Sequence, residues 1–164
     1  MKYFRGWTMG LVFSLSLLGC APVVKTDLKS FKENPEAYQG KEVIITTDVK
    51  SVVEDPESYL GRKIELKGFV KYNGFRGFSH WNFFLKDEEG RSLRCYEREY
   101  RIEAWIWPTT ILRRAERENE QLTVVGKLQK GKEIELDWVE YKGQTIDTDY
   151  KPPQFPVPLL FWLL

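Results

Sequence analysis

Residue types that often carry enzymatic chemistry are scarce in this chain. It contains two cysteines, Cys20 and Cys95, and a single histidine, His80. One histidine argues against a histidine-rich metal site and against a conventional Ser/His/Asp triad. The sequence also lacks a phosphate-binding glycine loop, a metal-spaced Cys/His cluster and a nucleophile motif. We therefore expect a non-catalytic protein without a metal or cofactor.

A strong charge of one sign is missing as well. The 164 residues include 25 basic and 24 acidic side chains, which gives a net charge of +1. This balance argues against a protein built mainly to hold nucleic-acid phosphates. Aromatic residues, in contrast, make up 15% of the chain and include six tryptophans. Such side chains fill hydrophobic cores or, where exposed, mark binding faces.

The apolar run near the amino terminus is short. It covers residues 10–18 and follows the basic residues Lys2 and Arg5. A membrane-spanning helix needs about 20 apolar residues, so this run is too short to be a stable one. A basic start followed by a short apolar run is the anatomy of an export signal. The run ends in Leu17-Leu18-Gly19-Cys20.

These four residues resemble the lipobox of bacterial lipoproteins. The resemblance implies that diacylglycerol is attached to the Cys20 sulfur, that residues 1–19 are removed as a signal peptide, and that the new amine is acylated. Two or more acyl chains anchor a protein stably in a membrane. The residue after Cys20 is Ala21 and not an aspartate. By resemblance to enterobacterial sorting signals, this implies the outer membrane, with the domain facing the periplasm. An ordinary secretory signal and an amino-terminal membrane anchor are the alternatives.

Residues 20–27 are expected to form an irregular tether, and an internal repeat follows them. It recurs with an offset of 21 residues: Lys29-Ser30, Asn34-Pro35-Glu36, Tyr38 and Gly40-Lys41 match Lys50-Ser51, Asp55-Pro56-Glu57, Tyr59 and Gly61-Arg62. Each copy predicts a helical turn at its proline, a stop at its glycine and then a strand, over residues 42–49 and 63–72. We interpret residues 28–49 as a duplicated helix-strand segment that lengthens or covers the following domain. A chance likeness between two helix-to-strand junctions is the alternative.

Alternating apolar residues predict five strands after Gly61. They are Ile64, Leu66, Gly68, Val70 and Tyr72; Trp81, Phe83 and Leu85; Leu93 and Cys95; Leu122, Val124, Gly126 and Leu128; and Ile134, Leu136 and Trp138. Residues 109–118 predict a short helix between the third and fourth strands. Gly68 in the middle of its strand predicts a sharp bend. Cys95 on an inward face is expected to be a small core residue.

This order of strands and helix resembles OB-fold modules of the anticodon-binding and single-strand-binding type. The resemblance rests on residues 64–70, residues 83–87 with Gly90, and residues 122–128. It implies an all-β protein with one or two short helices, in which residues 50–141 form a five-stranded Greek-key barrel. Residues 142–164 would be a carboxy-terminal extension whose proline-rich, apolar tail makes a second membrane or partner contact, or covers an end of the barrel.

Ligands of OB barrels usually lie across the second and third strands and the adjoining loops. The side chains expected there are Phe75, Arg76, Phe78, His80, Phe84, Arg94 and Tyr96. Aromatic rings with interleaved arginines could stack nucleic-acid bases or grip a sugar, a peptide or a protein. They could instead cover the core. We expect a membrane-anchored binding module for a protein or envelope component. The alternatives are an oligonucleotide- or DNA-binding lipoprotein and, as a third hypothesis, an envelope enzyme.

Overall fold

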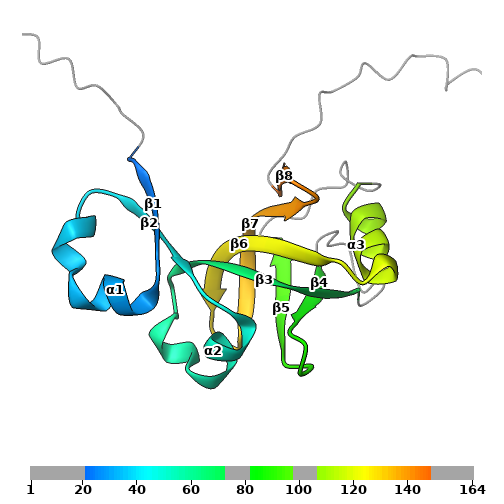
Figure 1. Cartoon of the computed structure of the whole chain (residues 1–164), viewed down its shortest axis with the longest axis horizontal. Coiled ribbons are helices and arrows are strands. Elements are labelled where there is room, and N and C mark those ends of the chain that lie inside the picture. Colours follow the sequence, from blue (N-terminus) through cyan, green and yellow to red (C-terminus); the bar gives the residue numbers. More distant parts are fainter. Residues whose placement is uncertain (1–20, 73–81, 98–106, 149–164) are drawn as a thin grey trace, which may run out of the picture.

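The computed structural model describes residues 21–72, 82–97 and 107–148. Within these residues, eight strands form one continuous sheet, and three α-helices and two 3-10 helices lie against it (Figure 1). Five of the strands close into a barrel, which confirms the predicted all-β, OB-like fold class. The other three extend the sheet at either end of the chain.

The amino-terminal part consists of two strand-helix units that lead into the barrel. The elements in order are β1 (Val23–Thr26), α1 (Leu28–Glu33), η1 (Pro35–Tyr38), β2 (Glu42–Thr46), α2 (Val49–Glu54), η2 (Pro56–Ser58) and β3 (Lys63–Tyr72). Strand β1 pairs in parallel with β2, and β2 pairs in parallel with β3. The two copies of the sequence repeat therefore stack side by side as equivalent units (Figure 1).

The repeat builds the same helix start twice. The side chain of Asp27 accepts a hydrogen bond from the backbone N–H of Ser30, at 2.9 Å, at the start of α1. Asp48 accepts the equivalent bond from Ser51, at 2.7 Å, at the start of α2. Aspartate at this position satisfies one of the free amide groups at a helix amino terminus. Both helices are thus specified locally.

The end of each unit is also duplicated. The Tyr38 hydroxyl lies 2.9 Å from the Thr26 hydroxyl, and the Thr47 hydroxyl donates to that of Tyr59 at 3.1 Å. These bonds fix each 3-10 turn to the strand that precedes its helix. Gly40 and Gly61 then take positive φ angles of 74° and 73°, which favour glycine. The predicted helical turns and glycine stops are confirmed.

The barrel follows the predicted order of three strands, a helix and two strands. After β3 come β4 (Asn82–Lys86), β5 (Ser92–Glu97), α3 (Trp107–Glu118), β6 (Gln121–Gln129) and β7 (Glu133–Tyr141). The strands pair in the order β3-β4-β5-β7-β6, and β6 pairs again with β3 to close the barrel. Strands β5 and β7 are parallel, whereas the other barrel pairs are antiparallel.

Gly68 lies where β3 changes partners. Residues 63–69 pair with β6 and residues 69–72 pair with β4, so β3 serves both sides of the barrel. A Cβ atom on Gly68 would lie 2.6 Å from the backbone oxygen of Lys86. Only glycine therefore lets β4 approach β3 so closely at this corner.

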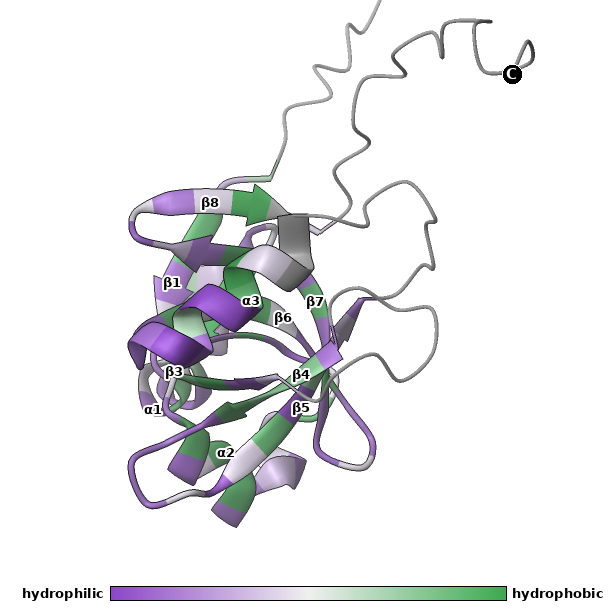
Figure 2. Cartoon of the chain, turned by 90° about the vertical axis from the view of Figure 1, so that its right-hand side faces the viewer, coloured by the Kyte–Doolittle hydropathy of each residue, from purple (hydrophilic) through white to green (hydrophobic). Residues whose placement is uncertain are grey.

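The barrel interior is the hydrophobic core. Its largest fully buried side chains include Phe83, Leu66, Leu93, Leu112 and Leu122. Leu112 belongs to α3, whose apolar side covers one end of the barrel, while its more hydrophilic turns face outward (Figure 2). The predicted inward alternation of β3, β4, β5 and β6 is confirmed over their described residues.

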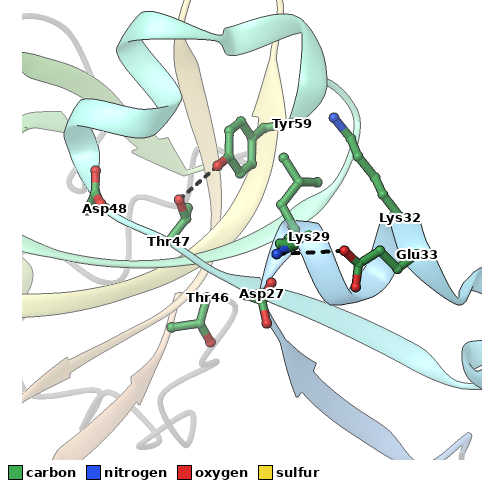
Figure 3. Close-up of a pocket in the computed structure, with 9 residues that line it drawn as sticks. Asp27, Lys29, Lys32, Glu33, Thr46, Thr47, Asp48 and Tyr59 are labelled. Carbon is green, nitrogen blue, oxygen red and sulfur yellow. Dashed lines mark hydrogen bonds and ion pairs between the residues drawn. The ribbon is translucent and has the colours of Figure 1, made fainter.

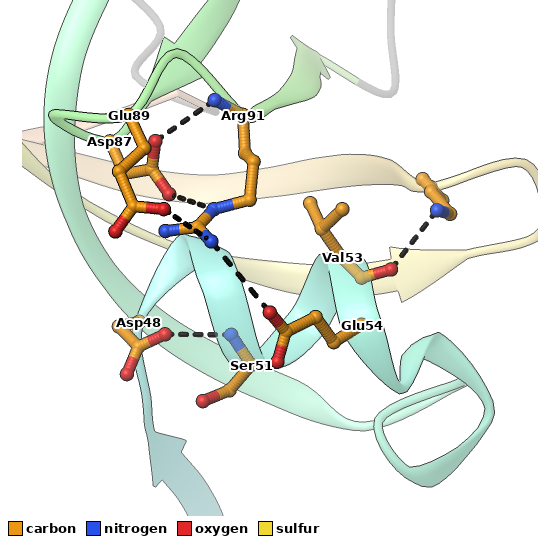
Figure 4. A network of polar contacts seen from close by, with 8 residues as sticks. Asp48, Ser51, Val53, Glu54, Asp87, Glu89 and Arg91 are labelled. Atoms are coloured by element: carbon orange, nitrogen blue, oxygen red, sulfur yellow. Dashed lines mark hydrogen bonds and ion pairs between the residues drawn. The ribbon is translucent and has the colours of Figure 1, made fainter.

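Helix α2 packs at another part of the barrel, against β3 and β5. Polar contacts hold it there (Figure 4). Arg91, next to the turn between β4 and β5, bonds Asp87 at 2.5 Å and Glu89 at 2.8 Å, and lies 3.7 Å from Glu54 of α2. Lys132, in the turn after β6, donates to the backbone oxygen of Val53 at 3.0 Å. Contacts from the turn between β4 and β5 and from the turn between β6 and β7 therefore hold α2 against the barrel.

Two local predictions in the amino-terminal part are wrong. Residues 21–27 are not irregular throughout, because residues 23–26 form β1 by pairing with β2. The strand predicted over residues 42–49 ends at Thr46, and Val49 begins α2. The Asp48 cap favours a helix at this point, and the buried side chains of Val49 and Val52 fix it to the core.

The prediction that Trp138 points inward with Ile134 and Leu136 is also wrong. The pairing of β6 with β7 shifts between Val125 and Gly126, which leaves Asp137 as an extra residue in β7. A bulge of this kind exchanges the two faces of a strand. Val139 is therefore buried beyond the bulge, and Trp138 is only half-buried. Beyond it, β8 (Gln144–Asp147) pairs with β7 and adds a strand within the predicted carboxy-terminal extension.

Candidate binding face of the barrel

The outer face of β4 and β5 carries three of the side chains predicted to bind a ligand. Antiparallel pairing sets Phe84 opposite Arg94, and Asn82 opposite Tyr96. Phe84 and Tyr96 are half-buried and Arg94 is exposed, whereas Phe83 and Cys95 between them point into the core. The strand alternation thus separates the interior from this outer surface.

Strand β7 adds two carboxylates that sequence reasoning missed. Its parallel pairing with β5 sets Glu133 beside Arg94 and Glu135 beside Tyr96. The five residues Phe84, Arg94, Tyr96, Glu133 and Glu135 are called the candidate face below. Because these glutamates alternate with the apolar residues Ile134 and Leu136, the sequence predicts that their side chains point outward. That they lie beside Arg94 and Tyr96 follows only from the pairing of β5 with β7.

Arg94 is held in a fixed position on this face. Its Nη1 donates to Glu133 Oε1 at 2.8 Å, and its Nε donates to Asn82 Oδ1 at 3.2 Å. The side chain of Arg94 remains 44% exposed and that of Glu133 remains 35% exposed. A partner can therefore reach both charges, but the arginine is already neutralised by its neighbour. An ion pair this exposed contributes little to stability, so its geometry matters more for recognition.

Tyr96 lies between charges of opposite sign. Partial burial raises the pKa of its phenol, and the carboxylates of Glu135 and Glu133 raise it further, while Arg94 acts in the opposite direction. The hydroxyl thus stays protonated at neutral pH and can both donate and accept a hydrogen bond. A tyrosine ring flanked by an arginine and two glutamates suits a ligand that carries both signs of charge better than a ligand with a chain of phosphates.

Cys95 faces the interior beneath this surface. Its side chain is fully buried, and burial raises the pKa of the thiol well above its ordinary value. A thiol of this kind is protonated at neutral pH and is a poor nucleophile. The prediction of a core residue is confirmed.

The remaining predicted site residues lie outside the described part of the chain. They are Cys20, Phe75, Arg76, Phe78 and His80. The described residues therefore assemble three of the seven predicted ligand contacts, on two adjacent strands.

A separate hollow of about 530 Å³ lies between α1 and the second copy of the repeat (Figure 3). Its polar groups are used by the fold itself, because Thr47 donates to Tyr59, and Asp27 and Asp48 cap the two helices. The lining offers no converging set of free polar groups, so we assign no ligand to it.

The described residues contain no group of three or more His, Cys, Asp or Glu residues arranged to hold a metal ion. No helix in the same residues has the length and apolar character needed to cross a membrane. Comparison with known proteins gives neither a matching protein-family model nor a matching curated sequence. The fold thus defines the class, a closed five-stranded OB-like barrel with a duplicated parallel extension.

Proposed function

We propose that this chain is a lipid-anchored protein of the bacterial cell envelope whose barrel binds a protein or another envelope component without catalysis. The anchor would be Cys20, in the outer membrane, with the domain on the periplasmic side. The observation that supports anchoring is the sequence Leu17-Leu18-Gly19-Cys20 behind a basic and apolar leader.

The observation that supports binding is the composition of the candidate face. Aromatic residues and arginine are the side chains most enriched in protein interfaces. Here Phe84, Tyr96 and Arg94 occur together on adjacent strands, and a hydrogen bond to Glu133 orders the side chain of Arg94. A preordered arginine loses little entropy when a partner binds.

The carboxylates argue for a partner of mixed charge. Glu133 pairs with Arg94, and Glu135 lies beside Tyr96, so a polyanion would meet repulsion along β7. A nucleic acid gains its affinity mainly by pairing phosphates with lysine and arginine. A polypeptide carries both signs of charge and hydrogen-bonding groups, and it suits this face better.

The test is affinity purification of the anchored protein from detergent extracts after mild crosslinking. Arg94→Ala and Tyr96→Ala should each reduce the recovery of a specific partner severalfold. Lys67→Ala is the matched control, because Lys67 is exposed on β3 and does not belong to the candidate face. Equal recovery with all three variants would show that this face is not the binding site.

A second measurement addresses the nucleic-acid alternative. A short single-stranded oligonucleotide is titrated at low and at physiological salt while tryptophan fluorescence is followed. We expect no binding at either concentration. Binding at low salt that weakens steeply with added salt would favour the oligonucleotide hypothesis.

A further inference from the structure

Regular structure begins almost immediately after Cys20. The backbone oxygen of Pro22 accepts a hydrogen bond from Glu42 N at 3.1 Å, and Val23 pairs with Glu42 as the first residue of β1. Ala21 alone separates Cys20 from this bonded segment. Two Cα–Cα steps span about 7 Å at most, so a lipid on Cys20 must lie close to the start of β1.

The surface at this end of the domain combines exposed apolar and polar side chains. Val23 is the one large hydrophobic side chain among the described residues that is exposed, at 56%. A groove of about 580 Å³ also opens on the first copy of the repeat, and its lining consists of Phe31, Pro35, Tyr38 and Val43 together with the polar residues Glu36, Gln39 and Lys41. Val43 pairs with Val24, so the groove adjoins the first residues of the sheet.

The second copy of the repeat shows how such a surface is normally used. Val52, Tyr59 and Ile64 occupy the positions that correspond to Phe31, Tyr38 and Val43, and they are buried. The second copy lies between the first copy and the barrel, and its Arg62 and Ser58 contact α1. The first copy has no such neighbour among the described residues, and its equivalent side chains are only partly buried.

We propose that this end of the domain, formed by residues 21–23 and 39–42, rests on the lipid headgroups of the membrane that holds Cys20. The proposal rests on lipidation of Cys20, as proposed above, and adds a fixed orientation to it. In Figure 1 the start of β1 lies at the top of the molecule, whereas α2 and the turn between β4 and β5 lie at the bottom. The start of β1 would thus face the membrane, whereas α2 and the turn between β4 and β5 would face the periplasm.

Site-specific labels can test the orientation in the full, lipidated chain. Gln39→Cys places a fluorophore next to β2, and Glu88→Cys places one in the turn between β4 and β5; both positions are exposed. The native Cys95 is fully buried and the Cys20 sulfur would carry lipid, so neither should compete for the label. The proteins are reconstituted into phosphatidylcholine vesicles that contain a headgroup spin-labelled lipid as a quencher.

We expect the label at Gln39 to be quenched severalfold more strongly than the label at Glu88. A flexible insertion of twenty Gly/Ser residues between Ala21 and Pro22 is the control, and it should reduce this difference. A difference that persists with the insertion would show that the surface binds lipid by itself, and would also support the proposal. Equal quenching of both labels without the insertion would overturn it.

The intact mass of the same sample separates the two proposals. A mass that includes the acyl groups together with equal quenching would overturn the orientation and leave the proposed function standing. A mass that shows an unmodified Cys20 would remove the premise, and both proposals would then fail.

Discussion

Gly126 offers a sharp test of how the barrel closes. A Cβ atom at this residue would lie 2.3 Å from the backbone oxygen of Glu135 and 2.8 Å from Ile134 Cγ2. The φ angle of Gly126 lies outside the left-handed region, so an alanine would suit its backbone conformation. The cost of Gly126→Ala must therefore come from the contact with β7, next to the bulge.

The expected sign opposes the usual effect of this substitution. Replacing glycine by alanine inside a strand normally gains about 0.5–1 kcal/mol. Forcing one extra carbon into a well-packed site costs about 1–3 kcal/mol, and backbone atoms cannot move aside as a side chain can. We therefore expect Gly126→Ala to lower the free energy of unfolding by about 1–2 kcal/mol, and Gly126→Asn to lower it further.

Gly131 is the matched control for this prediction. It takes a φ angle of +83°, but nothing lies within 4 Å of its Cβ position. Here the cost is backbone strain, which asparagine tolerates better than alanine. Gly131→Asn should thus be less destabilising than Gly131→Ala, whereas the order is reversed at Gly126.

The assay is urea unfolding of an unlipidated form that begins at Ala21, followed by tryptophan fluorescence. Comparable m values would show that the variants unfold to similar states. Wild-type stability of Gly126→Ala, or the same order of alanine and asparagine at both glycines, would refute the close approach of β6 and β7 as the reason for this glycine.

Three further predictions follow from other contacts. Asp48→Ala should lower the free energy of unfolding by about 1 kcal/mol through loss of the α2 cap, whereas Asp27→Ala should mainly reduce hydrogen-exchange protection in the first copy. Hydrogen bonds from Lys142 and then Arg114 lower the pKa of Glu118 to about 2. Its contribution to stability should be complete above pH 4.5 and disappear as the pH falls towards 2, and Glu118→Gln should flatten this part of a melting-temperature profile. In an equilibrium pull-down, Arg94→Lys should retain part of the partner binding that Arg94→Ala loses, because a lysine keeps the charge but cannot bond Glu133 and Asn82 at the same time as the guanidinium does.

The barrel could be predicted from the sequence because its signals are local and consistent. Alternation in β3 and β6 shows directly which side chains are buried, and Gly68 marks the corner between them. The repeat located both 3-10 turns and their glycine stops through a match of residue types at one offset. Each of these signals is carried by residue types within a single strand or a single copy of the repeat.

Other features were missed because they depend on pairing between distant residues. Strand β1 has four residues without clear alternation, and it exists because β2 offers it a parallel partner. The bulge at Asp137 depends on the register between β6 and β7, and Lys63 pairs with the displaced carboxylate at 2.8 Å. Helices α1 and α2 were missed although their signal is local. Each begins with an aspartate that is followed three residues later by a serine, at Asp27 and at Asp48.

The candidate face divides in the same way. Alternation along β4 and β5 predicted that Phe84, Arg94 and Tyr96 point outward. It could not predict that Glu133 and Glu135 lie beside them, because parallel strands joined through a helix leave no short-range signal. The two carboxylates give this face mixed charge, which argues further against the oligonucleotide alternative.

The differences between the two copies of the repeat indicate what each copy faces. Both keep the aspartate cap, the proline, the tyrosine bond and the glycine, which build the unit by itself. They differ where the second copy packs towards the rest of the domain, because Val53 and Leu60 correspond to the exposed residues Lys32 and Gln39 of the first copy. A closely packed protein core would leave these polar groups without water. Lipid headgroups and water would not, and Gln39 lies in the surface proposed to rest on them, whereas Lys32 donates a hydrogen bond to Ser58 of the second copy.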